Sequence, residues 1–110
     1  MARFVRPHLE TSVAFAPDSV LLVLSGELDL ATVAVLDDSL RRAESARRPV
    51  VLVDLAGVTF MDCAGLTVLL AAARRASETG GEVSVMRASA SIRRLLELTA
   101  VDQSLSVIPA

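Results

Sequence analysis

Hydrophobic and polar residues change their spacing several times along this chain of 110 residues. Residues 9–15 alternate loosely, residues 20–24 are all apolar, and the turn sequence APDS lies between them. This arrangement predicts a β-hairpin. Residues 31–46 predict an amphipathic helix, because their apolar side chains recur at helical spacing and the charged ones lie largely elsewhere. The apolar positions of this helix are Val33, Leu36, Leu40 and Ala43.

The middle of the chain predicts a strand followed by a helix. Residues 50–55 form an apolar, β-branched run interrupted by Asp54, which is typical of a central strand buried on both faces. Residues 66–76 carry apolar side chains at the i, i+3, i+4 and i+7 positions of a helix. Gly80 and Gly81 would end this helix, since glycine is common just beyond a helix terminus.

The remaining segments complete an alternating pattern. Residues 82–86 predict a strand, Ser89 can cap a third helix, and residues 105–108 predict a last short strand that Pro109 would stop. The order is therefore β-β-α-β-α-β-α-β. Strands that alternate with helices predict a largely parallel sheet, to which the opening hairpin adds an antiparallel edge. We expect a single α/β domain.

Composition narrows the function classes. Hydrophobic residues make up 53% of the chain, which excludes intrinsic disorder. Aromatic residues make up only 3%, so the chain lacks the stacking surfaces used to bind single-stranded nucleic acid. The net charge is -2 and the arginines form no basic stripe, which argues against binding to a phosphate backbone.

Cysteine content and hydropathy indicate a compartment. Cys63 is the single cysteine, so no intrachain disulfide can form and a reducing cytoplasm is expected. The first ten residues lack the apolar run of a signal peptide. The longest uncharged apolar run, residues 63–73, is too short to cross a membrane. We expect a cytoplasmic protein without a membrane span.

Catalytic chemistry is poorly represented. His8 is the single histidine and lies near the N-terminus, where a solvated surface role is expected. His8 and Cys63 are the only soft metal ligands, so no metal site is predicted. The glycine-rich phosphate-binding motifs are absent. The acids Glu27, Asp29, Asp54 and Asp62 are predicted to lie at strand ends as turn or cap residues. We therefore expect no enzyme and no cofactor.

Two stretches are predicted to form loops at strand-to-helix junctions, SGELDLAT (residues 25–32) and MDCAGL (residues 61–66). Sites in open α/β sheets usually form at the carboxyl ends of strands. A helix that begins near Cys63 would direct unpaired N–H groups outward, which attracts anions and favours the thiolate form of a cysteine. The simpler alternative is a capped helix start, with Asp62 accepting backbone hydrogen bonds and Gly65 permitting close packing.

Four stretches also carry a family resemblance. They are GELDLAT (residues 26–32), VVLVDLAGVTFMDCAGLTVLL (residues 50–70), GGEVSVM (residues 80–86) and IRRLLELTAVD (residues 92–102). At this spacing they resemble the STAS domain family, and in particular the bacterial anti-sigma factor antagonists. The resemblance implies a single STAS domain over residues 1–110, with its core at about 9–108. The implied fold is a small mixed sheet with helices packed mainly on one face.

The resemblance also implies a function. Family members of this kind are interaction modules, not enzymes, and bind an anti-sigma factor serine kinase to regulate sigma-factor-dependent transcription. The implied partner-binding residues of the first junction are Gly26, Glu27, Asp29 and Thr32. Those of the second junction are Asp62, Cys63, Ala64, Gly65 and Leu66.

The family's phosphoacceptor serine falls on Cys63, directly after Asp62. Because cysteine has no hydroxyl, we expect partner binding without the phosphorylation switch. Thr59 and Thr67 lie nearby. Thr59 is expected to close the strand and Thr67 to lie one turn into the helix, so neither is expected to replace the serine.

Two other functions agree with the same residues. Small STAS domains also serve as accessory subunits of lipid transporters of the ATP-binding cassette class, or as signalling scaffolds, and a domain without the acceptor serine suits such a role. Cys63 at a helix start could instead act as a thiol-based redox sensor. The sequence leaves the oligomeric state open, a homodimer included.

Overall fold

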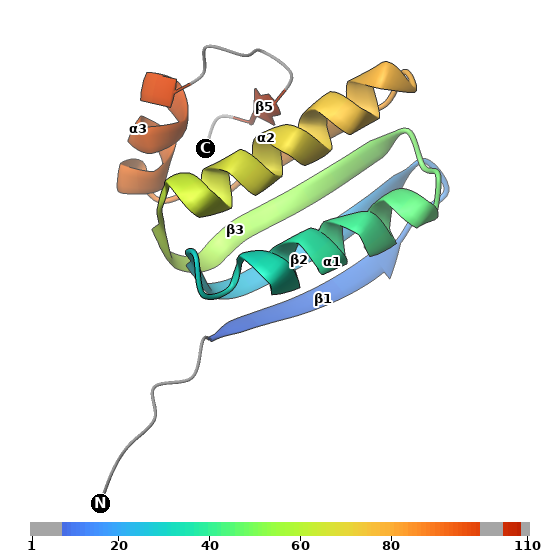
Figure 1. Cartoon of the computed structure of the whole chain (residues 1–110). Helices are drawn as coiled ribbons and strands as arrows, with labels where there is room; N and C mark the ends of the chain where they lie inside the picture. Colours follow the sequence, from blue (N-terminus) through green and yellow to red (C-terminus); the bar gives the residue numbers. More distant parts are fainter. Residues whose placement is uncertain (1–7, 100–104, 109–110) are drawn as a thin grey trace, which may run out of the picture.

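The computed structural model describes residues 8–99 and 105–108, which form a five-stranded sheet and three helices (Figure 1). The strands are β1 (Leu9–Phe15), β2 (Ser19–Leu28), β3 (Val50–Met61), β4 (Glu82–Met86) and β5 (Leu105–Val107). The helices are α1 (Val33–Ser45), α2 (Cys63–Glu78) and α3 (Ala90–Thr99). The predicted order of elements is confirmed. Pro109 lies outside the described residues.

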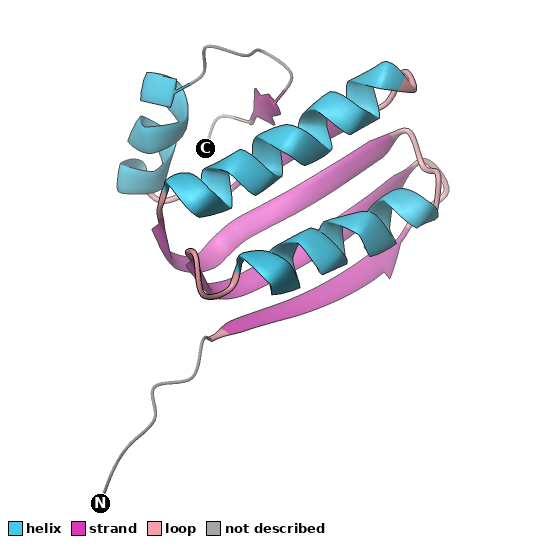
Figure 2. Cartoon of the chain, in the orientation of Figure 1, coloured by secondary structure: helices cyan, strands magenta, loops and turns pink. Residues whose placement is uncertain are grey.

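The strands lie in the sheet in chain order, β1-β2-β3-β4-β5. β1 is antiparallel to β2, and all the other pairs are parallel. Each helix connects two neighbouring parallel strands and each connection steps in the same direction. Because such connections are right-handed, they place their helices on the same face of the sheet. Figure 2 shows α1 and α2 side by side across that face, so the predicted fold class is confirmed.

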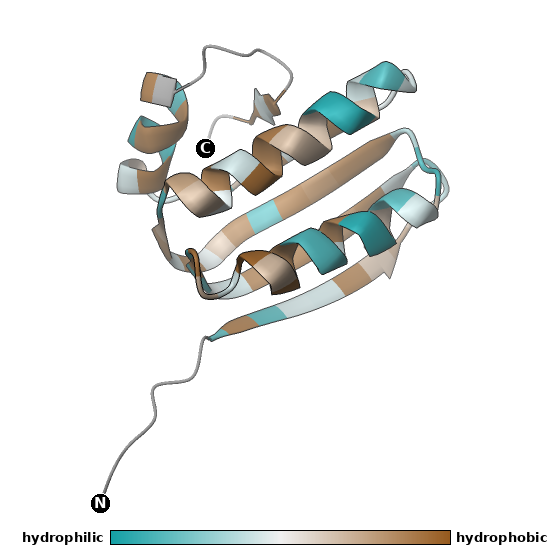
Figure 3. Cartoon of the chain, in the orientation of Figure 1, coloured by the Kyte–Doolittle hydropathy of each residue, from teal (hydrophilic) through white to brown (hydrophobic). Residues whose placement is uncertain are grey.

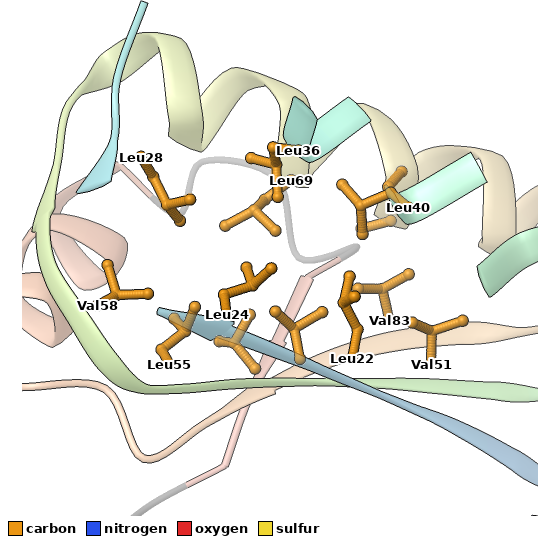
Figure 4. Packing of buried hydrophobic residues seen from close by; sticks show 14 of the residues in the cluster. Leu22, Leu24, Leu28, Leu36, Leu40, Val51, Leu55, Val58, Leu69 and Val83 are labelled. Atoms are coloured by element: carbon orange, nitrogen blue, oxygen red, sulfur yellow. The ribbon is translucent and has the colours of Figure 1, made fainter. Parts of the chain in front are cut away.

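The core fills the space between this face and the helices. β2 contributes alternate residues to the core, and Figure 4 shows Leu24 beneath Leu36 of α1 and Leu69 of α2, with Leu22 farther along the strand. These four side chains have no exposed surface. Burial of each one contributes about 1.5–3 kcal/mol to folding. α3 adds Ile92 and Leu96 to the same cluster.

Both central strands are longer than the apolar pattern predicts. β2, predicted at residues 20–24, continues to Leu28, and β3, predicted at residues 50–55, continues to Met61. Residues 25–28 and 61 therefore lie in strands, and residues 63–66 lie in a helix. Only residues 29–32 and 62 of the two predicted loops lie outside strands and helices, so the rest of that prediction is wrong.

Two β-bulges explain the difference in β3, whereas the predicted β2 is too short because Ser25 and Gly26 are residue types typical of turns. Val23 of β2 pairs with Asp54 and Ser25 pairs with Gly57, so β3 has one residue more than β2 between these pairs. A second register shift follows Gly26. A bulge interrupts the alternation of side chains, so a regular sequence pattern stops there while the strand continues.

Asp54 lies within β3, and the prediction that it ends a strand is wrong. Its Oδ1 accepts a hydrogen bond from the Ala56 N–H (2.9 Å), which stabilises the first bulge. Arg87 donates to both carboxylate oxygens, through Nε to Oδ1 (3.2 Å) and through Nη2 to Oδ2. The hydrogen bond from this guanidinium holds the pKa of Asp54 below its usual range. The ion pair therefore compensates a carboxylate that is only 4% exposed.

Within the described residues, no helix covers the second face of the sheet. Val51 and Val53 are buried beneath the helices, whereas Leu52 on the other face is only half-buried. The prediction that residues 50–55 are buried on both faces is therefore wrong at Leu52, although Asp54 on the same face is buried. Within residues 8–99 and 105–108, no helix is long and apolar enough to cross a membrane.

Candidate partner-binding site

The two predicted junctions meet at one edge of the sheet. Leu28, at the end of β2, pairs with Met61 at the end of β3. The backbone N–H of Asp62 donates to the carbonyl oxygen of Leu28 (3.0 Å), and the Thr59 hydroxyl donates to that of Gly26 (3.3 Å). The structure therefore brings the two junctions together through backbone pairing, with the Thr59 side chain as a further contact.

The second junction is a capped helix start. Oδ1 of Asp62 accepts hydrogen bonds from the N–H groups of Ala64 (2.9 Å) and Gly65 (3.1 Å). This confirms the predicted cap, which satisfies two of the four N–H groups that a helix start leaves unpaired. Cys63 follows the cap as the first helical residue, and its side chain is exposed. The turn therefore presents the thiol to solvent.

Gly65 fixes the contact between the two junctions. A Cβ atom at this position would lie 2.8 Å from both the Cβ and the carbonyl oxygen of Leu28. No larger residue fits without moving the start of α2 away from β2. The predicted close packing at Gly65 is confirmed.

The first junction is held by hydrogen bonds within its own loop. The Thr32 hydroxyl is fully buried and donates to the carbonyl oxygen of Glu27 (2.7 Å). Oδ1 of Asp29 accepts from the N–H groups of Ala31 (3.0 Å) and Thr32 (3.1 Å). Gly26 has a φ of +124° and lies so close to the His8 carbonyl that a Cβ atom would be 2.4 Å away. The Thr32 hydroxyl and the Asp29 carboxylate therefore shape the loop, whereas the Glu27 side chain is exposed.

The residues assigned to partner binding differ in accessibility. Thr32, Gly65 and Leu66 are buried, so they shape the site from below. Glu27 and Cys63 are exposed. The half-buried residues are Gly26, Asp29, Asp62 and Ala64.

Exposed apolar side chains surround the junctions, and sequence reasoning missed them. Leu30 is 77% exposed, Phe60 49% and Val35 45%. With Cys63 they form what we call the apolar end of the molecule, where β2 and β3 end and α1 and α2 begin. Figure 3 shows apolar colours at the starts of both helices and hydrophilic colours towards their ends. The exposure of Leu30 could have been predicted from the sequence, because this leucine lies in a polar turn and outside the apolar stripe of the following helix.

The two threonines near Cys63 have occupied hydroxyls. Thr59 lies within β3, two residues before its end, and makes the hydrogen bond to Gly26 described above. The Thr67 hydroxyl donates to the Cys63 carbonyl oxygen (2.7 Å), one turn into α2 as predicted. Both side chains donate their hydroxyl protons to the backbone of the site.

The opposite end of the helical layer is hollowed and charged. A cavity of about 600 Å³ lies between the ends of α1 and α2. Arg47, Arg48 and Arg75 line it, and we call these three residues the basic end. Nε of Arg75 donates to Oε1 of Glu44 (3.0 Å), which ties α2 to α1.

Comparisons with known proteins agree with this architecture. The family described as "Mlab, STAS domain" matches residues 11–109. An anti-sigma factor antagonist from Mycobacterium paratuberculosis has a TM-score of 0.83 at 24% identity, over 96% of this chain and 90% of that chain. The phosphorylated form of the Bacillus cell fate determinant SpoIIAA has a TM-score of 0.69 at 17% identity, over 91% and 92% of the two chains. An antisigma-factor antagonist STAS domain from Rhodobacter sphaeroides has a TM-score of 0.60 at 19% identity, over 76% and 94%.

These structural similarities fall below 25% identity and show the shared fold. The family match covers most of the chain and includes both junctions, the capped turn at Asp62 and the closely packed Gly65. The chain therefore belongs to the STAS domain family.

Proposed function

We propose that this protein is an anti-sigma factor antagonist-like interaction module that binds a kinase-type anti-sigma factor through its apolar end. The observation that supports this most is the exposure of Leu30, Phe60 and Cys63 around two junctions in which Thr32 and Asp62 already bond to the local backbone. Exposed apolar side chains gathered at one place are typical of protein-binding surfaces. Binding would release the sigma factor and so regulate transcription.

The second part of the proposal is that the phosphorylation switch is missing. A phosphoserine at the start of α2 would add about 1.5–2 negative charges beside the Asp62 carboxylate. Repulsion and desolvation there would weaken an interface. Cys63 offers a thiol in place of the hydroxyl, and the hydroxyls of Thr59 and Thr67 are held by backbone carbonyls. The protein would then bind its partner constitutively.

A matched pair of leucine variants tests the binding surface. Leu30 and Leu98 are 77% and 76% exposed, but Leu30 lies at the apolar end and Leu98 on α3. We expect Leu30→Asp to weaken binding to the purified anti-sigma kinase by about a hundredfold, equivalent to roughly 2.8 kcal/mol. Leu98→Asp should bind as the wild type does. Isothermal titration calorimetry measures both, and equal affinities for the two variants would refute the docking surface.

The missing acceptor also favours a second candidate function, as an accessory subunit of an ATP-binding cassette transporter or a signalling scaffold. Such a subunit needs an exposed surface and no phosphoacceptor, which agrees with Cys63 at the exposed turn. Affinity purification from the native lysate separates the candidates. Recovery of a transporter ATPase without any anti-sigma kinase would support the second function and refute the first.

A further inference from the structure

The two edges of the sheet are protected to different degrees. β5 forms one edge and has three residues. β1 forms the other edge with seven residues, and its register with β2 continues from Leu9 to Phe15 without a bulge. Proteins commonly protect edge strands by shortness, bulges, prolines or charges. From Thr11 to Phe15, β1 has none of these.

The backbone of β1 can be divided into groups that face β2 and groups that face outward. The His8 carbonyl oxygen accepts from the Glu27 N–H (3.1 Å), and the Ala16 N–H donates to the Ser19 carbonyl (2.9 Å). Hydrogen bonding alternates along an antiparallel strand, so the even-numbered residues bond to β2. The odd-numbered residues therefore direct their N–H and C=O groups toward the open edge. These residues are Leu9, Thr11, Val13 and Phe15.

We propose that β1 pairs with β1 of a second copy of this chain, antiparallel and about a twofold axis at Ser12. In this register Leu9 lies opposite Phe15 of the second copy, and Thr11 lies opposite Val13. Each of these pairs joins two odd-numbered residues, so all the outward backbone groups find partners. The two sheets then form one continuous sheet through an isologous interface.

Side chains are also complementary in this register. Phe15 is 61% exposed in a single copy and would be covered by Leu9 of the second copy. Glu10, the charged residue of β1, would lie opposite Ala14, so the symmetry brings no like charges together. This self-complementarity favours a second copy over an unrelated strand. The inference does not rest on the proposed function, because β2 separates β1 from β3 and the turn at Asp62 stays accessible.

Thr11 provides a variant that affects the edge alone. Thr11→Pro removes an outward N–H and leaves the bonds between β1 and β2 in place, since proline is tolerated where its missing N–H faces solvent. Both copies lose a hydrogen bond, so we expect the dissociation constant to rise about tenfold or more. Thr11→Val keeps the N–H and should dimerise as the wild type does. Sedimentation equilibrium measures association, and circular dichroism verifies that both variants fold.

Ser12 tests the register, because it would face itself across the twofold axis. We expect Ser12→Lys and Ser12→Glu each to weaken association several-fold through like charges, and an equimolar mixture to restore it as a heterodimer. Ser106→Lys on β5 should have no effect. A second readout is disulfide trapping: with Cys63→Ala, Ser12→Cys should form an intermolecular disulfide and Glu10→Cys should not. A wild-type protein that stays monomeric up to about 1 mM, or a dimer insensitive to both Ser12 charges, would overturn the proposal.

Discussion

The apolar end and the basic end of the helical layer handle their polar groups in different ways. At the apolar end, Asp62 and Thr32 satisfy backbone groups locally, and the surface around them is largely apolar apart from the exposed Glu27. At the basic end, Arg75 reaches across to Glu44 and so connects two helices. The difference is that polar groups at one end bond to their own backbone and leave apolar side chains exposed, while an ion pair at the other end connects the two helices.

Substitution of Gly65 should produce the largest effect, because it would displace the start of α2 at the apolar end. Gly65→Ala places a Cβ atom 2.8 Å from the Leu28 backbone and side chain, so α2 must shift. We expect the free energy of unfolding to fall by about 1–3 kcal/mol and partner binding to weaken with it. Urea denaturation measures the loss.

A glycine near the basic end is the control for this variant. Gly80 has a φ of +79°, but nothing beyond its adjoining residues lies within 4 Å of the position that a Cβ atom would take. Gly80→Ala should therefore cost about 1 kcal/mol from backbone conformation alone, without loss of partner binding. If Gly65→Ala were the milder of the two, close packing would not explain the apolar end.

Removal of the Asp62 cap should have a moderate effect confined to the apolar end. Asp62→Ala leaves the Ala64 and Gly65 N–H groups without their acceptor. We expect a loss of about 1 kcal/mol in stability and faster amide hydrogen exchange in the first turn of α2. Asp62→Asn keeps an acceptor oxygen and should restore most of the protection. Equal exchange in the alanine variant and the wild type would contradict the capping role.

The Asp54–Arg87 ion pair lies in the middle of the sheet, between the two ends, and its contribution to stability can be measured separately. Its effect depends on pH, since the pKa of Asp54 is lower in the folded state than the ordinary value near 3.9. The stabilisation is therefore present at neutral pH and is lost as pH falls below about 4.

We expect Asp54→Asn to cost about 1 kcal/mol at pH 7, because solvent screens the exposed guanidinium, and to approach the wild type near pH 3. Asp38→Asn removes an exposed ion pair with Arg42 and should change stability little at either pH. Urea unfolding at the two pH values checks both variants. A constant difference between wild type and Asp54→Asn would show that the charge of Asp54 is unimportant.

The smallest effect is expected at the basic end. Arg75→Met removes the hydrogen bond to Glu44 and keeps most of the apolar stem. The pair is partly exposed, so we expect a loss of up to about 1 kcal/mol and no change in partner affinity. Thermal unfolding and titration calorimetry measure the two quantities. If Arg75→Met lost partner affinity, the basic end would contribute to partner binding, and the apolar end would not act alone.

The sequence predicted features that depend on nearby residues. The order of strands and helices, the Asp62 cap and the packing of Gly65 follow from local patterns. Features that depend on distant pairs were missed. The bulges arise where β3 pairs with β2, and the tie between Arg75 and Glu44 joins residues 31 positions apart. Neither leaves a periodic signal in the sequence.

The exposure of Phe60 could not be predicted for a related reason. A phenylalanine after an apolar run resembles a core residue, and only the second bulge shows otherwise. Phe60 pairs with Glu27 beyond that bulge, and the buried residue is the next one, Met61. The apolar end therefore depends on strand geometry that a period of two does not contain.

Phosphate transfer to Cys63→Ser tests the central proposal most directly. The partner kinase is incubated with labelled ATP and with wild type, Cys63→Ser or Cys63→Ala. We predict label on Cys63→Ser alone, at the new serine, with all three proteins bound by the kinase. Label on the wild type would contradict the loss of the switch, and absence of binding by the wild type would contradict the docking surface.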